Sequence, residues 1–152
     1  MVKKNNFNKV IKHKNGDYFN YKGKQYYIDG KNIVIDFKNG EEEFANILSK
    51  LITKRIELLP RFNKPDGIKT ADSKIGNIYV DFKITTSGTD KFIFNNVNIA
   101  KEQSNHFIFW IKNNDIPLGV IKYQIDDIFR RIKSVNTIGY YRNRHLKIYK
   151  RK

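Results

Sequence analysis

The chain has no cysteine among its 152 residues, which excludes disulfide frameworks, zinc–thiolate sites and thiol chemistry. It also lacks an apolar run near the ~20 residues that a membrane-spanning helix needs, and its opening MVKKNN has no apolar secretory-signal segment. We therefore expect a soluble chain with no membrane partner, in which any metal is bound by oxygen atoms or histidine.

Acidic residues are scarce, and the last of them is Asp127. Fifteen Asp and Glu stand against thirty Lys and Arg, a formal net charge of +15. A field of this sign concentrates polyanions, whose counterions are released on binding. We therefore favour nucleic acid as the partner over an acidic protein or a merely solubilising surface. Tyr140 and Tyr141 lie within the basic C-terminal third and could stack on unpaired bases, although core packing is the commoner use of a tyrosine.

The composition predicts one folded domain after a short lead-in. Residues 1–24 are rich in lysine and asparagine, so we expect a flexible or marginally ordered segment with little chemistry. Residues 25–152 are expected to form a single domain. Aromatic residues make up 14% of the chain and can fill its core.

Periodicity and turn signals predict the order of the elements. Asp29-Gly30 predicts a hairpin within 25–37, and the helical spacing of Phe44, Ile47 and Leu48 predicts a helix from Glu41. The other expected elements are strands over 56–60, 106–112 and 145–150, a loop over 61–70, two strands over 68–85, and helices over 96–105 and 122–133. This order indicates an α/β sandwich with a central mixed β-sheet flanked by helices.

Three charged residues are expected to converge on neighbouring strands. Asp81 and Lys83 are two residues apart on a predicted strand and so share its charged face, and Asp72 precedes them across a glycine turn. Two carboxylates can hold a divalent cation, and a nearby lysine can lower the pKa of the attacking water or steady a phosphate. The alternative is a solvated strand face on which Asp and Lys pair, since Asp-x-Lys alone has little specificity.

A longer motif surrounds these residues. GIKTADSKIGNIYVDFKITTSGTDKF resembles the core of PD-(D/E)XK superfamily nucleases, as found in C-terminal toxin domains of contact-dependent growth inhibition (CdiA-type) proteins and in related phage and mobile-element proteins. EEEFANILSKLITKRIELLP upstream and AKEQSNHFIFWI downstream are also similar to that family, so the resemblance covers about residues 41–112. Ala71 replaces the motif's proline, and Asp81 replaces the commoner glutamate.

The resemblance implies a restriction-endonuclease-like fold and an endonuclease active site. Asp72 and Asp81 would be metal ligands, Lys83 the catalytic lysine, and Gln103 a polar residue that supports the site. The implied cofactor is a divalent ion, Mg²⁺ or Mn²⁺, with Zn²⁺ as the alternative.

The family also has a metal-supporting glutamate on the helix that precedes these strands. We assign it to Glu43, which stands four residues before Ile47 at the edge of the apolar stripe and could reach inward. Glu41, Glu42 and Glu57 are the rival candidates.

The resemblance suggests an intercellular toxin, delivered as the C-terminal part of a secreted or cell-surface protein, acting in the cytoplasm and neutralised by an acidic immunity protein. We favour transfer RNA or other structured RNA as substrate. The alternatives are a DNase of a phage or mobile element, and a non-enzymatic nucleic-acid-binding module. The cations expected to contact phosphates are Lys69, Lys101, Arg130, Arg131, Arg142, Arg144 and Lys147.

The histidines are few and widely separated. His13, His106 and His145 are the three in the chain, and their spacing argues against a histidine metal cage. We expect His106, beside an apolar strand, to be a packed or surface imidazole. A metal-free ribonuclease needs a general acid and a general base, and His145 with Lys147 or Tyr149 could provide them.

Overall fold

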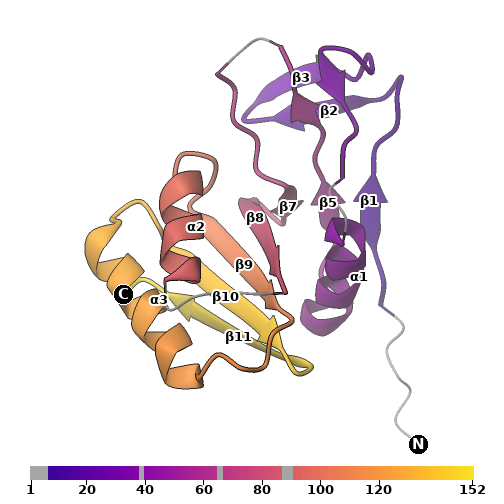
Figure 1. Cartoon of the computed structure of the whole chain (residues 1–152). Helices are drawn as coiled ribbons and strands as arrows, with labels where there is room; N and C mark the ends of the chain where they lie inside the picture. Colours follow the sequence, from indigo (N-terminus) through magenta and orange to yellow (C-terminus); the bar gives the residue numbers. More distant parts are fainter. Residues whose placement is uncertain (1–6, 38–39, 65–66, 87–90) are drawn as a thin grey trace, which may run out of the picture. The chain divides into compact units, whose positions relative to one another are not determined.

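A computed structural model describes residues 7–37, 40–64, 67–86 and 91–152 (Figure 1). Its strands form a seven-stranded mixed sheet in the order β1-β5-β7-β8-β9-β10-β11 and two small sheets, β2-β3 and β4-β6. The elements are β1 (Val10–Lys12), β2 (Tyr18–Tyr21), β3 (Lys24–Tyr27), β4 (Ile33–Val34), α1 (Glu41–Ile52), β5 (Ile56–Leu58), β6 (Arg61–Phe62), β7 (Ser73–Ile75), β8 (Ile78–Thr85), α2 (Phe92–Ala100), β9 (His106–Ile111), α3 (Leu118–Arg131), β10 (Thr137–Arg142) and β11 (His145–Lys150). The predicted α/β class with a central mixed sheet and flanking helices is confirmed, and it is consistent with a sandwich.

The chain divides into two compact units, residues 1–78 and 79–152, which we call the N-terminal and C-terminal units. This differs from the expected lead-in followed by one domain over 25–152. Each unit buries apolar side chains of its own, such as Phe44 and Leu48 in the first and Phe107 and Phe109 in the second, all 0% exposed. A separate core in each half explains why the chain clusters as two units.

The segment for which the sequence predicted a flexible lead-in contains strands β1 and β2. Strand β1 forms a parallel ladder with β5, in which Val10 is in register with Ile56. Strand β2 alternates exposed and buried side chains, and Phe19 and Tyr21 are each only 3% exposed. The rings of Phe19 and Phe62 lie 5.8 Å apart. The aromatic residues of this lysine-rich segment thus provide the apolar surface that orders it.

The N-terminal hairpin forms around Lys22-Gly23, and the prediction of a hairpin at Asp29-Gly30 is wrong. Lys22 and Gly23 have φ values of 50° and 79°, as a two-residue type I′ turn requires, and they join β2 to β3. The Asp29 carboxylate instead accepts the backbone N–H groups of residues 31–33 at 2.7–3.0 Å and closes a loop. Strand β4 then pairs with β6, so the loop expected over 61–70 begins with a short strand.

The helix expected from Glu41 is confirmed as α1. Glu41, Glu42 and Glu43 occupy its first turn, where their charges oppose the positive end of the helix dipole. Phe44 and Leu48 lie on its buried face. The predicted strand at 56–60 is confirmed as β5, and the predicted glycine turn between β7 and β8 contains Gly76 at φ 59°.

The C-terminal unit packs α2 and α3 against its strands. Strands β8, β9 and β10 are parallel, and β11 is antiparallel to β10. Helices α2 and α3 lie side by side and share a core cluster with alternate residues of β9 (Figure 1). The expected apolar strand over 106–112 is confirmed as β9, in which Phe107 and Phe109 are buried on the helix side and Ile108 is buried on the other side.

Helix α2 begins at residue 92 and ends at residue 100, whereas the sequence predicted 96–105. Phe92 and Ile93 in its first turn belong to the core cluster. Because these two side chains are buried there, the helix begins earlier than the sequence predicted. Helix α3 likewise begins at residue 118, four residues before the predicted start, directly after Pro117. Strand β10 was not predicted.

In the described part of the chain, none of the helices has the length and apolar character needed to cross a membrane.

Replacing Ile125 by alanine should destabilise the protein by about 2–5 kcal/mol, because it opens a cavity beneath α3 where the side chain is 0% exposed. Ile99→Ala is the matched control. That isoleucine also lies on a helix of the same unit but is 79% exposed, so its effect should remain within about 0.5 kcal/mol. Urea unfolding of both variants measures the difference, and equal losses would contradict the core described above.

Candidate functional site

Strand β8 carries an ion pair in its buried middle. Asp81 is 1% exposed, the side chain of Lys83 is 25% exposed, and Lys83 Nζ lies 2.9 Å from Asp81 Oδ2. Asp81 is in register with Phe107, which is fully buried. The alternative of a solvated strand face is therefore wrong at Asp81, because Asp81 and its neighbours Val80 and Phe82 are all buried.

The ion pair does not satisfy Asp81 completely. Asp81 Oδ2 is buried and, apart from the ion pair with Lys83 Nζ at 2.9 Å, has no hydrogen-bond partner within the described residues. A buried carboxylate oxygen without a hydrogen-bond donor is costly, and such atoms are commonly satisfied by an ion or a water molecule. A hard carboxylate oxygen of this kind suits a divalent cation such as Mg²⁺ or Mn²⁺.

Asp72 belongs to the N-terminal unit, whereas Asp81 and Lys83 belong to the C-terminal unit. Asp72 is half-buried in a bend immediately before β7, and its backbone oxygen accepts a hydrogen bond from Leu59 N at 2.9 Å. The bend is thus fixed to the end of β5. The predicted site residues are distributed between the two units, and each part has a defined place within its own unit.

The structure corrects the argument that selected Glu43. Glu41 is buried, with 6% exposure, and Glu43 is exposed. The buried face of α1 includes Phe44 and Ala45, which stand three and four residues after Glu41 and so extend this face to the first turn. Within the described residues, no three His, Asp or Glu side chains form a group that could hold a metal.

The other rival glutamates have cationic or imidazole partners. Glu42 Oε1 lies 2.7 Å from Lys12 Nζ at the surface. Glu57 on β5 lies 2.8 Å from His13 Nε2, and both of these side chains are largely buried. Glu41 is thus the buried acid of α1, and burial is the property on which the choice of Glu43 was based.

Gln103 lies in the turn that follows α2, where it is half-buried and its N–H donates to Ala100 O at 2.9 Å. The next residue, Ser104, fastens this turn to β8, because its hydroxyl donates to Tyr79 O at 2.7 Å. Sequence reasoning missed Ser104, since a lone serine before a strand carries no distinctive signal. The role of Gln103 stays a prediction.

The predicted phosphate-binding cations occupy different environments. Lys69, Lys101, Arg144 and Lys147 are exposed. Arg142 is half-buried, and its Nη1 donates to Ile116 O at 2.6 Å, so it holds the loop before α3 in place.

Two further cations of the predicted set share an acid on α3. Arg130 and Arg131 are both exposed and both pair with Asp127, the second at 3.2 Å. The charge of Asp127 therefore offsets part of the positive field at this end of the helix.

Tyr140 does not have the base-stacking role considered for it. It is 9% exposed and packs against Tyr149, with ring centroids 6.4 Å apart. Burial raises the pKa of its hydroxyl. Tyr141 is half-buried with its ring edge toward Trp110, at a centroid distance of 6.1 Å.

His106 is half-buried at the start of β9, and its Nδ1 lies 2.8 Å from Thr137 Oγ1. Burial, with a smaller effect from the charge of Lys150, lowers its pKa. The prediction of a packed imidazole is thus confirmed for His106. His145 is exposed at the start of β11, and its catalytic role stays an untested alternative.

Comparisons with known proteins match the fold alone. No family model matches the sequence, and no curated protein matches it. A chain of the CdiA-CT/CdiI toxin and immunity complex from Burkholderia pseudomallei has a similar structure, with a TM-score of 0.55 and 15% sequence identity. The match covers 72% of this chain and 81% of that chain. The fold of this protein is therefore similar to one found in a contact-dependent toxin–immunity system.

Replacing Lys83 by methionine should lower the free energy of unfolding by about 3 kcal/mol, because Asp81 would keep a buried charge without its partner. The double variant Asp81→Leu/Lys83→Met should recover most of this loss, since it removes both charges. Urea unfolding of the single and double variants forms the thermodynamic cycle. Losses that simply add would show that the two side chains are not coupled.

Proposed function

We propose that the protein is a metal-dependent endonuclease that hydrolyses phosphodiester bonds. The observation that carries this proposal is the buried Asp81 carboxylate, whose Oδ2 accepts no hydrogen bond within the described residues and lies beside the Lys83 ammonium. A carboxylate of this kind fits a divalent cation, and the motif around it resembles that of nucleases which use one.

In this proposal each residue has a distinct task. Asp81 supplies a fixed oxygen ligand, and Asp72 is the second ligand of the sequence prediction. Glu41, a rival of Glu43 in that prediction, is the buried acid of α1. When bound, a divalent ion supplies a water of lowered pKa and stabilises negative charge on the phosphate. Lys83 Nζ, held on the same strand face, orients the attacking water or neutralises a phosphate oxygen.

The burial of Asp81 also serves this chemistry. In a site with little water, the charge of Lys83 acts on a phosphate with less dielectric screening than at the surface. The 25% exposure of the Lys83 side chain leaves it accessible from one side, while Asp81 at 1% remains fixed. The substrate would therefore approach on the side of Lys83.

We further propose that the biological role is that of a toxin in a contact-dependent system, neutralised by an acidic immunity protein. The toxin–immunity complex with a similar fold supports this role, and the net charge of +15 suits both a nucleic acid and an acidic inhibitor. RNA is the favoured substrate, and DNA is the alternative that the cleavage experiment distinguishes.

Transfer RNA and plasmid DNA should be incubated in parallel with the protein, with Mg²⁺ or Mn²⁺ and with EDTA. We expect metal-dependent cleavage, with RNA as the preferred substrate, and a loss of about 10²–10³-fold in Asp81→Asn. Asp115→Asn is the matched control, since Asp115 is an exposed acid of the same unit, and it should cleave like the parent protein.

The outcomes separate the alternatives. If the protein cleaves only the plasmid, the proposed active site stands, but its substrate is DNA and not RNA. Equal cleavage by Asp81→Asn and the parent would contradict the proposed site. Binding without cleavage in any metal would contradict the enzyme and favour a nucleic-acid-binding module.

A further inference from the structure

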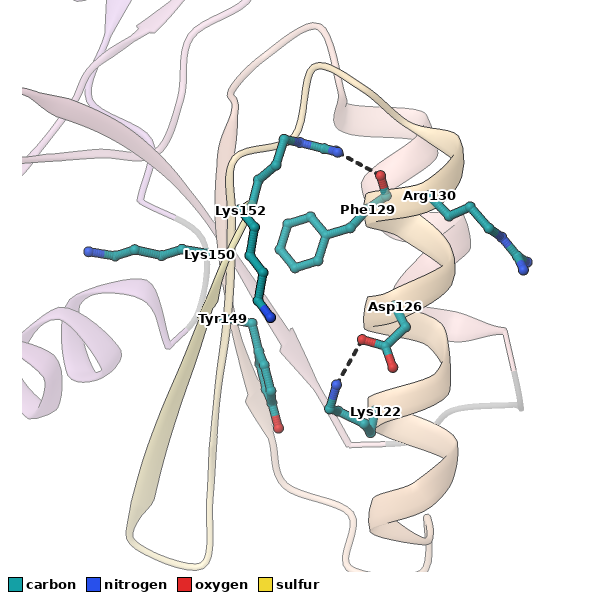
Figure 2. A pocket seen from close by; sticks show the side chains of 8 residues that line it. Lys122, Asp126, Phe129, Arg130, Tyr149, Lys150 and Lys152 are labelled. Carbon is teal, nitrogen blue, oxygen red and sulfur yellow. Dashed lines mark hydrogen bonds and ion pairs between the residues drawn. The ribbon is translucent and has the colours of Figure 1, made fainter.

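The C-terminal unit contains an open hollow of about 460 Å³, and neither Asp81 nor Lys83 is among the residues that line it (Figure 2). It lies between α3 and the C-terminal end of β11 with the two residues that follow. Its volume is within the ~300–1,000 Å³ typical of small-molecule sites. The residues that line it are Lys122, Asp126, Phe129, Arg130, Tyr149, Lys150, Arg151 and Lys152.

The hollow combines aromatic rings with ammonium groups. Figure 2 shows the rings of Phe129 and Tyr149 along it, with Lys152 running past them toward Lys122. Lys150 points away on the far side of β11, and Arg130 points outward from α3. The inward-facing cations are therefore Lys122 and Lys152.

Arg151 holds this arrangement in place. Its guanidinium donates to three backbone oxygens at the C-terminal end of α3 and just beyond it, those of Phe129, Ile132 and Val135, at 2.7–2.8 Å. Carbonyl groups at the end of a helix lack intrahelical donors, and Arg151 supplies donors to these three, of which Ile132 O also accepts Val135 N at 3.2 Å. Because Arg151 joins the end of the chain to α3, it fixes the positions of its neighbours in β11 and at the C-terminus.

Tyr149 is the central ring of the hollow. Lys122 Nζ lies 5.0 Å from its centroid, and Lys147 Nζ lies 5.5 Å from it. Tyr140 supports the ring from the core at 6.4 Å. A half-buried ring that is supported from behind loses little entropy when a planar group stacks on it.

Lys122 and Asp126 add polar groups to the wall. Their side chains pair at 2.8 Å, and this hydrogen bond raises the pKa of Lys122, which keeps the ammonium charged. Asp126 also offers oxygens that can accept N–H groups. A ligand that satisfies all of these groups has a planar aromatic part with N–H donors and an anionic part.

We infer that the hollow is a subsite for one unpaired nucleotide of a nucleic-acid chain. The base stacks on Tyr149 beside Phe129, its amino group faces Asp126, and its phosphate lies between Lys122 and Lys152. The inference rests on the proposed function in taking a nucleic acid as substrate, and it adds a preference for single-stranded or looped segments. A base held within a duplex cannot leave its stack to enter the hollow without a cost.

Binding should be measured without cleavage, in the Asp81→Asn background with EDTA present. The probes are a fluorescently labelled single-stranded oligoribonucleotide and the duplex of the same length, followed by anisotropy. Tyr149→Leu should weaken single-strand binding by about 10-fold, as expected from the loss of one stacked base. Tyr149→Phe keeps the ring and should bind like the parent, which separates stacking from folding defects.

Charge-matched variants test the phosphate contact. Lys152→Gln should weaken single-strand binding more than Lys133→Gln, which removes an equal charge from an exposed lysine that does not line the hollow. The affinity for the duplex should fall equally in Lys152→Gln and Lys133→Gln. Equal effects on the single strand, or tight binding by a folded Tyr149→Leu, would overturn the subsite.

The two proposals fail in different ways. If the parent protein cleaves nucleic acid but Tyr149→Leu binds the single strand normally, the subsite is wrong and the nuclease remains. If Tyr149→Leu and Lys152→Gln lose single-strand binding while the parent never cleaves, the subsite is supported and the nuclease is wrong.

Discussion

The C-terminal unit depends on a charged pair within an otherwise apolar strand. Asp81 lies in the middle of β8 between Val80 and Phe82, and all three are nearly inaccessible. A carboxylate in this position is tolerated only with a close counter-charge, which Lys83 supplies from the same strand. Burial of Asp81 still costs free energy, because its Oδ2 atom accepts no hydrogen bond in the described structure. An apolar side chain would fold more readily here, so the pair suggests a functional constraint.

Two regions of the C-terminal unit have related roles in the proposals: the region of Asp81 on β8 and the hollow around Tyr149. The core cluster beneath α2 and α3 makes the sheet rigid, and Ser104 fastens the turn after α2 to β8. Between α3 and the end of β11, Arg151 joins the end of the chain to the helix and shapes the cationic hollow around Tyr149. In the proposals, the first region would supply a fixed carboxylate for chemistry, and the second would supply a ring and charges that bind a single strand.

The sequence predicted the elements whose local signals are strong. The α1 stripe, the apolar run of β9 and the Gly76 turn each specify a local conformation, and the structure confirms them. The hairpin at Lys22-Gly23 was missed because lysine is an uncommon residue at positive φ, whereas Asp29-Gly30 has the usual signal but uses its carboxylate to close a different loop.

Side-chain environments were harder to predict, because burial depends on contacts distant in sequence. Alternation along β8 predicted a polar face that includes Asp81, yet Asp81 is buried, in register with Phe107 of the core cluster that α2 and α3 share. Glu43 was preferred over Glu41 from the apolar stripe of α1, but the buried face of the helix includes Glu41, and Glu43 is exposed. Tyr140 packs in the core through β10, a strand that periodicity did not predict.

The most direct test of the account is the binding of Mn²⁺ to the protein by isothermal titration calorimetry, with Asp81→Asn in parallel. The account predicts saturable binding to the parent protein and its loss in the variant, which removes the charge of the buried carboxylate at nearly constant volume. Equal binding by both proteins, or no saturable binding by the parent, would contradict the assignment of Asp81 as a metal ligand.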